Sequence, residues 1–277
     1  MYALYAPRER CYAHAIDDAG CPRNRLYWKS ALQARKVFEG RVDAFEYYGD
    51  TILWQYLNVA IPHIIAADLR AYRQLGVREM QVLGFGAYSL WAHGLNLATF
   101  AYLSSGMETD VEAAIARFAR ERFGAEAEER MVAYYLALEE AQAGYLGFCP
   151  YEDEWMHDLR GFSRPSPGYA EHRRRVAESR EQFQEIAEML AQAAAHCKGD
   201  PFVENQRAEQ AHLEITRIEL GQLDMRLAVG ERITNGDPAD WTEEERTRRA
   251  AARQRQWEIA QTVPKEIRGQ AFGALTA

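Results

Sequence analysis

Positive charge is in short supply in this chain, in which 33 lysines and arginines face 41 aspartates and glutamates, for a formal net charge of −8. A nucleic-acid binder needs a concentrated basic surface to neutralise phosphates. The arginine-rich segments 173–175 and 247–255 lie among acids and helix-forming residues, a pattern typical of a solvated helix face. We therefore expect no nucleic-acid partner.

Long apolar runs are missing as well. The sequence contains no stretch of about 18 apolar residues, the length needed to cross a bilayer. Met1 is followed directly by YALYAP, without the basic leader and apolar region of a signal peptide. These absences predict a cytoplasmic protein without a membrane partner.

Cysteine is scarce, because four cysteines are too few for a disulfide scaffold in a chain of 277 residues. Cys11, His14 and Cys21 have the spacing C-x2-H-x6-C, but no fourth zinc ligand stands at a suitable spacing. A disulfide between Cys11 and Cys21 would require an exported protein. We therefore assign no metal and no cofactor from the sequence.

Apolar residues make up 48% of the chain, enough for a large core, and residues 1–104 alternate between strand and helix patterns. Short apolar runs bounded by turn residues predict the strands, and apolar spacing with a closing glycine predicts the helices. A β-α-β-α-β-α order is typical of parallel strands joined by right-handed crossovers. The expected strands are 2–6, 42–48 and 79–85, and the expected helices are 25–40, 62–75 and 94–104.

From residue 108 onward the pattern is helical only. Thr242 and Glu245 form a capping-box signature at the start of the last long helix. We divide the chain at the proline- and glycine-rich connector that begins at residue 147. The expected domains are 1–146, strands and helices, and 147–277, a helical region with a long hairpin over 169–230.

The working residues of a parallel α/β sheet lie at the carboxyl ends of its strands and in the loops that follow. Side chains alternate along a strand, so Glu46 shares a side with Ala44, a small residue suited to a barrel interior. We expect the Glu46 carboxylate to face the open mouth at the strand ends.

Three strand–helix units cannot close an eight-stranded barrel of about 250 residues. The expected partner is therefore a missing N-terminal barrel half or another copy of the chain.

The chain resembles the bacterial domain-of-unknown-function family 4838, which is similar to the glycoside hydrolase barrel superfamily, over about residues 1–140. The resemblance implies an α/β fold with a partial TIM-type (β/α) barrel of about three parallel βα units, followed by an all-helical region. It also implies a site that handles a saccharide, without specifying which one. The matching segments are YAPRERCYAHAIDDAGCPRN, FEYYGD, IAADLRAYRQLGVREMQVLGFGAYSLWAHGLNLATFAYL and RFARERFGAEAEERMVAYYLALE.

Glycoside hydrolysis uses two carboxyl groups about 5 to 10 Å apart. Glu46 and Asp50 are the candidate catalytic pair, with Glu46 as the acid if partial burial raises its pKa. In a second interpretation, Glu46 pairs with Arg8 or Arg10 and only holds the structure. In a third, related barrels carry their acids after the fourth strand, so the catalytic pair lies in a missing segment and both residues belong to the substrate-binding wall.

Further residues at strand ends or in the following loops are candidates for saccharide contact. Aromatic rings such as Tyr47 offer a flat apolar surface with a polar edge, and a loop histidine among acids suits a ligand or proton-transfer role. Trp54 is expected to pack in the core. The predicted substrate-binding residues are Arg8, Arg10, Tyr12, His14, Asp18, Tyr48 and Trp91.

Three functional hypotheses remain open at this stage. The first is a glycoside hydrolase-like protein that binds and hydrolyses a saccharide at the strand ends. The second is a non-catalytic carbohydrate-binding or assembly subunit, because the catalytic pair is incomplete in this chain. The third is a helical interaction protein whose working surface is the hairpin 169–230.

Overall fold

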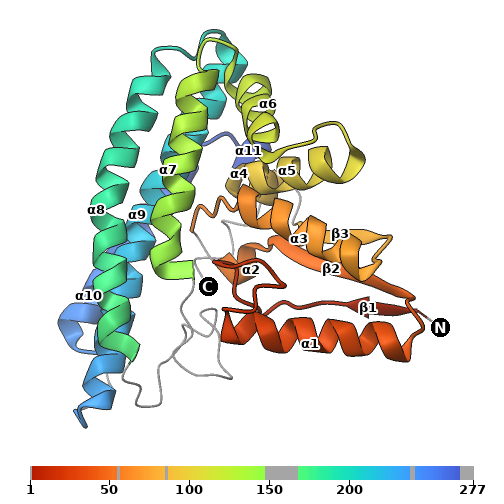
Figure 1. Ribbon diagram of the computed structural model, residues 1–277. Helices are drawn as coiled ribbons and strands as arrows, with labels where there is room; N and C mark the ends of the chain where they lie inside the picture. Colours follow the sequence, from red (N-terminus) through yellow and green to blue (C-terminus); the bar gives the residue numbers. More distant parts are fainter. Residues whose placement is uncertain (1, 55–56, 85–86, 147–167, 238–240, 269–277) are drawn as a thin grey trace.

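A small parallel sheet forms the N-terminal part of the protein (Figure 1). Its strands β1 (Ala3–Tyr5), β2 (Val42–Gly49) and β3 (Met80–Gly84) pair in that order, with Leu4 opposite Asp43 and Phe45 opposite Gln81. The computed structural model describes residues 2–54, 57–84, 87–146, 168–237 and 241–268. The predicted α/β class with parallel strands is confirmed.

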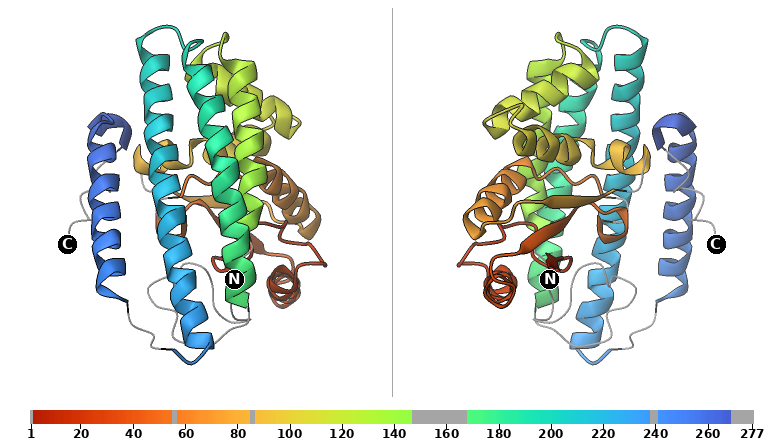
Figure 2. Two further views of the ribbon diagram at one scale, coloured as in Figure 1. Left: turned by 90° about the vertical axis from the view of Figure 1, so that its left-hand side faces the viewer. Right: turned by 90° about the vertical axis from the view of Figure 1, so that its right-hand side faces the viewer.

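Helices α1 (Pro22–Val37) and α3 (Pro62–Leu75) connect the three strands and lie on the same face of the sheet (Figure 2). Each begins with a proline, whose missing N–H has no partner to lose in the first turn. Gly76 ends α3 in the left-handed conformation, with φ of 86°, as expected from its position. On that face Ala44 packs against residues of both helices.

Among the described residues, no helix packs on the opposite face of the sheet as α1 and α3 do on the first, and we call it the open sheet face. Leu4 is 54% exposed, Gln81 is exposed, and Phe45 and Tyr47 are half-buried. The rings of Phe45 and Tyr47 meet edge to face, with centroids 5.2 Å apart. Residues with odd numbers on β2 thus point away from the two crossover helices.

Shorter helices follow β2 and β3 and lead into the helical region. Asp110 caps α6 (Val111–Phe123) because its carboxylate accepts the backbone N–H of Ala113 at 2.8 Å. The predicted capping box of Thr242 and Glu245 is confirmed at the start of α10 (Glu243–Gln261). The helices that follow β2, apart from α3, are α2 (Thr51–Trp54), α4 (Ala87–Ala92), α5 (Gly94–Ser105), α6 (Val111–Phe123), α7 (Glu128–Leu146), α8 (Gly168–Ala194), α9 (Asp200–Thr234), α10 (Glu243–Gln261) and α11 (Lys265–Arg268).

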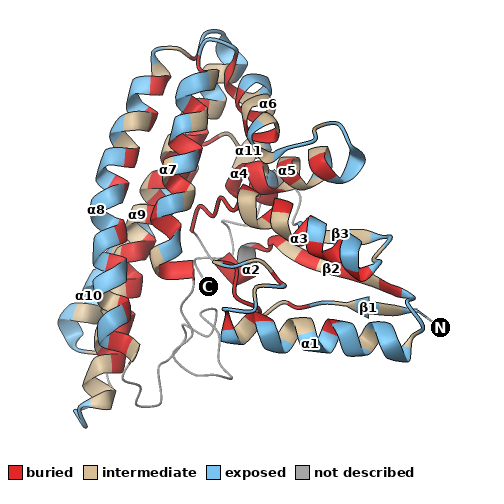
Figure 3. Ribbon diagram, in the orientation of Figure 1, coloured by how far each residue is buried: buried red, intermediate tan, exposed pale blue. Residues whose placement is uncertain are grey.

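Helices α7, α8 and α9 run side by side, and their buried residues face one another while exposed residues cover the outer sides (Figure 3). One continuous core joins them to the strand region. Asn58, in the connection after β2, donates its backbone N–H to Thr216 of α9 at 2.7 Å, and Ala60 donates to Gln142 of α7 at 2.9 Å. The predicted boundary at 146/147 therefore falls within a shared core, and most of the predicted connector, 147–167, lies outside the described residues.

The close contact of α7 with α8 depends on a glycine. A Cβ atom at Gly144 would lie 2.5 Å from the Ser179 hydroxyl oxygen and 3.2 Å from the Arg175 carbonyl oxygen. We expect Gly144→Ala to lower the free energy of unfolding by about 1–3 kcal/mol, because the helices must separate. Gly221→Ala is the matched control: its Cβ meets nothing within 4 Å, so better helix propensity should stabilise by about 0.5–1 kcal/mol. Urea unfolding of both variants measures whether the free energy of unfolding falls in Gly144→Ala and rises in Gly221→Ala.

Among the described residues, no helix combines the length and apolar character that a membrane crossing requires.

Candidate functional site

A buried polar cluster lies at the carboxyl end of β2, where the loop after β1 meets α3. At its centre is Arg10, a fully buried side chain that forms ion pairs with the equally buried carboxylates of Glu46 and Asp68. The Arg10 Nε lies 3.3 Å from a Glu46 oxygen, and Arg10 Nη2 donates to Asp68. Three tyrosines complete this group. We call it the Arg10 cluster, consisting of Arg10, Tyr12, Glu46, Tyr48, Asp68 and Tyr72.

Hydroxyl and amide donors satisfy the two carboxylates. Tyr72 donates its hydroxyl to Glu46 at 2.6 Å, and Tyr12 donates to Glu46 at 3.3 Å. Asp68 accepts the Tyr48 hydroxyl at 3.0 Å and the backbone N–H of Ile16 at 2.7 Å. Buried charges are tolerated when they are paired and hydrogen-bonded in this way.

Two carboxylates share one guanidinium, so the cluster carries an electrostatic conflict. Burial raises the pKa of Asp68 to about 7; the positive charge of Arg10 acts in the opposite direction, and the negative charge of Glu46 adds to the rise. Burial also raises the pKa of Tyr12 and Tyr72 well above the usual value, which keeps their hydroxyls protonated as donors. The arrangement favours a fixed structural network.

The expected orientation of Glu46 is wrong. Glu46 does share a side of β2 with Ala44, but that side faces α1 and α3 instead of an open mouth. Its side chain is fully buried, so no substrate reaches it in this structure. The interpretation in which Glu46 pairs with Arg10 matches the geometry.

Asp50 lies with Arg8 beside the open sheet face. Its carboxylate accepts the Arg8 Nε at 2.8 Å and the backbone N–H of Leu53 at 3.1 Å. The Arg8 guanidinium lies 5.8 Å from the centre of the Tyr47 ring, and the Arg8 side chain is 26% exposed. Arg8 and Tyr47 thus reach solvent where Asp50 and Glu46 do not.

The remaining predicted residues occupy other places. Asp18 is half-buried and caps its own loop by accepting the backbone N–H of Gly20 at 2.7 Å. Trp91 is buried on α4, where its indole N–H donates to the Ala208 carbonyl of α9 at 2.8 Å. Neither residue joins the Arg10 cluster, so their expected saccharide contacts have no support in this geometry. Trp54 packs in the core as expected.

His14 is exposed in the loop after β1, where it lies close to the buried residues Cys11 and Cys21. The sequence assigned no metal to these residues, because a fourth ligand was missing. The structure nevertheless brings their three ligand atoms within 4.8 Å of one another.

Asp68 and Tyr72 were missed from the sequence. Both lie on α3, four residues apart and hence on the same face, beside the apolar residues Ile65 and Leu69. An acid on the apolar face of a helix signals a buried partner, and that signal was present in the sequence.

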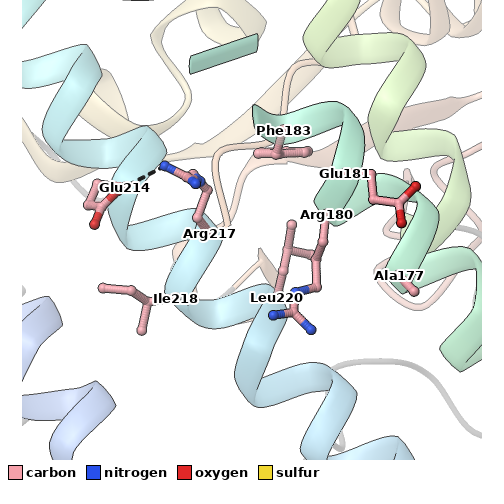
Figure 4. Close-up of a pocket in the computed structure, with 8 residues that line it drawn as sticks. All are labelled: Ala177, Arg180, Glu181, Phe183, Glu214, Arg217, Ile218 and Leu220. Atoms are coloured by element: carbon pink, nitrogen blue, oxygen red, sulfur yellow. Dashed lines mark hydrogen bonds and ion pairs between the residues drawn. The ribbon is translucent and has the colours of Figure 1, made fainter. Parts of the chain in front are cut away.

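A separate hollow of about 510 Å³ lies on the surface of the hairpin formed by α8 and α9 (Figure 4). Arg217, one of its lining residues, donates to Glu214 at 3.4 Å and to Gln184 at 2.7 Å. The hollow contains none of the predicted site residues. Its lining consists of Ala177, Arg180, Glu181, Phe183, Glu214, Arg217, Ile218 and Leu220.

Comparison with known proteins returns no matching family model, no matching curated protein and no matching solved structure.

Proposed function

We propose that the chain forms part of a glycoside-hydrolase-like (β/α) barrel and binds a saccharide at the strand ends, on the open sheet face. The observation that carries the proposal is the one-sided packing of the sheet. In a (β/α) barrel all crossover helices lie outside, and the other face of every strand lines the interior. Here α1 and α3 share one face, and Leu4, Phe45 and Tyr47 occupy the other.

The proposed binding surface consists of Tyr47 with Arg8 and Asp50. Tyr47 offers an aromatic ring for stacking on a sugar, and Arg8 offers N–H donors for hydroxyl groups. Asp50 holds the Arg8 guanidinium in place through the ion pair of 2.8 Å. Arg8 follows β1 and Tyr47 lies near the end of β2, and both side chains reach solvent. Sites in parallel α/β sheets lie at such strand ends.

The proposal assigns binding to this chain and places the catalytic carboxylate pair on additional strands. Glu46 is buried beneath α3, where it accepts the Tyr72 hydroxyl, and Asp50 is buried and paired with Arg8. Neither carboxylate is therefore available to act on a sugar bound at the open sheet face. Additional strands would pair with β1, which is an outer strand of the described sheet. This favours the carbohydrate-binding or assembly subunit over a complete hydrolase.

The test is saccharide binding by the purified chain. A panel of immobilised oligosaccharides identifies the ligand, and titration calorimetry then measures its affinity. We expect Tyr47→Ala to weaken binding by about two- to tenfold, because a lost stacking contact is worth about 0.5–1.5 kcal/mol. The matched control is Tyr102→Ala, because Tyr102 also lies beneath an arginine, Arg117, but on α5. Absence of binding to any saccharide, or equal loss in both variants, would contradict the proposal.

A further inference from the structure

Two cysteines and a histidine from the loop after β1 converge on one point. The ligand atoms of Cys11, His14 and Cys21 all lie within 4.8 Å of one another, and the Cys11 sulfur lies 3.3 Å from His14 Nδ1. Zinc–sulfur bonds of about 2.3 Å and zinc–nitrogen bonds of about 2.0–2.1 Å, at tetrahedral angles, place ligand atoms about 3.5–3.8 Å apart. Small side-chain rotations would therefore enclose one metal ion.

The backbone that carries two of these ligands is fixed by neighbouring side chains. The buried amide of Asn24, on α1, accepts the Cys11 N–H at 2.8 Å and donates to the carbonyls of Cys11 at 2.8 Å and His14 at 2.9 Å. Arg10 donates to the same two carbonyls at 3.2 and 3.3 Å. The loop is thus held in shape by protein groups alone, which lowers the cost of ordering it around an ion.

The third ligand stands at the start of a helix. Cys21 is the N-cap residue of α1, and its sulfur accepts the Asn24 N–H at 3.5 Å. The position of Cys21 at the start of α1 thus fixes the backbone that carries the third ligand.

We propose that Cys11, His14 and Cys21 form a site for Zn²⁺, with three protein ligands and a fourth position open to solvent on the exposed His14 side. Two thiolates and an imidazole suit Zn²⁺ and disfavour Mg²⁺ and Ca²⁺, which prefer oxygen ligands. Both cysteines bind the metal ion as thiolates, so binding releases any thiol protons to solvent. This site is independent of the proposed saccharide surface.

Metal titration of the full chain tests the site. The protein is reduced, stripped with a chelator and titrated with Co²⁺, which reports thiolate ligation through charge-transfer absorption and tetrahedral geometry through intense visible bands. We expect one Co²⁺ per chain, displaced by an equal amount of Zn²⁺, with a higher melting temperature for the metal-bound protein. Absence of the charge-transfer absorption would overturn the proposal, as would a Cys11–Cys21 disulfide that persists after treatment with the reductant.

Variants distinguish metal binding at this site from metal binding by other cysteines of the chain. Cys21→Ser and His14→Ala should lose stoichiometric Co²⁺ binding, and the exposed position of His14 makes its replacement compatible with folding. Cys197→Ser is the matched control, because Cys197 is also a buried free cysteine but lies outside the group. Unchanged binding in His14→Ala, or equal loss in Cys197→Ser, would exclude the proposed ligand set.

Discussion

Replacing Arg10 by methionine should lower the free energy of unfolding by about 3–5 kcal/mol, because it leaves two carboxylates buried without their shared cation. Glu46 and Asp68 are fully buried, and neither can turn toward water. The methionine side chain fills much of the volume of the arginine side chain. The loss of stability therefore reflects the missing charge more than lost packing. Urea unfolding followed by circular dichroism at pH 8 measures the change, because Asp68, whose pKa is about 7, is ionised there in the unaltered protein.

A surface arginine serves as the control. Arg41 is 48% exposed and pairs with Glu39, which is 79% exposed, so Arg41→Met should change stability by at most about 0.5 kcal/mol. Adding Asp68→Asn to Arg10→Met should recover part of the loss, since one unpaired charge is removed. Similar effects of Arg10→Met and Arg41→Met would show that the Arg10 cluster is not a buried ionic network.

Acidification should unfold the protein through two buried histidines. Burial lowers the pKa of His93 to about 4 and places that of His212 well below its usual value, with the positive charge of Arg122 adding to the effect on His212. For such groups the unfolded state binds protons first, so stability is complete above about pH 6.5 and is lost as the pH falls toward 4. For His93 the loss amounts to about 3 kcal/mol at pH 4.

The measurement is the free energy of unfolding of His93→Asn and of the unaltered protein at pH 7 and pH 4. We expect the decrease between the two pH values to be about 3 kcal/mol smaller in the variant. Asp68 has a raised pKa, so it adds stability as the pH falls over the same range. Its contribution is present in both the variant and the unaltered protein, and it cancels when the two are compared.

His63→Gln provides a control of opposite sign. Burial acts to lower the pKa of His63, but its contacts with Glu139 and Glu112 raise it overall, so this histidine contributes stability at acid pH. The variant should therefore lose more stability on acidification than the unaltered protein. An identical pH dependence in all three proteins would contradict the assignment of acid lability to His93.

Local patterns in the sequence predicted most of the elements. Gly76 ends α3 and Thr242 begins α10 because turn and cap preferences act within a few residues. Short apolar runs located the three strands, and the alternation of strand and helix patterns indicated that the strands are parallel. The grouping of Glu46 with Ala44 on one side of β2 was likewise correct, because alternation is a property of the strand itself.

Sequence patterns alone gave the sides of β2 on which residues lie and the approximate position of the long helices, although α1 was expected at 25–40 and spans Pro22–Val37. They also gave the spacing of Cys11, His14 and Cys21. Contacts between distant parts of the chain place the Glu46 side of β2 beneath α1 and α3. They also bring Asp68, 58 residues after Arg10, to the Arg10 guanidinium as its second carboxylate partner. Strand periodicity is local, whereas the identity of the covered face depends on how helices distant in the chain pack across the sheet.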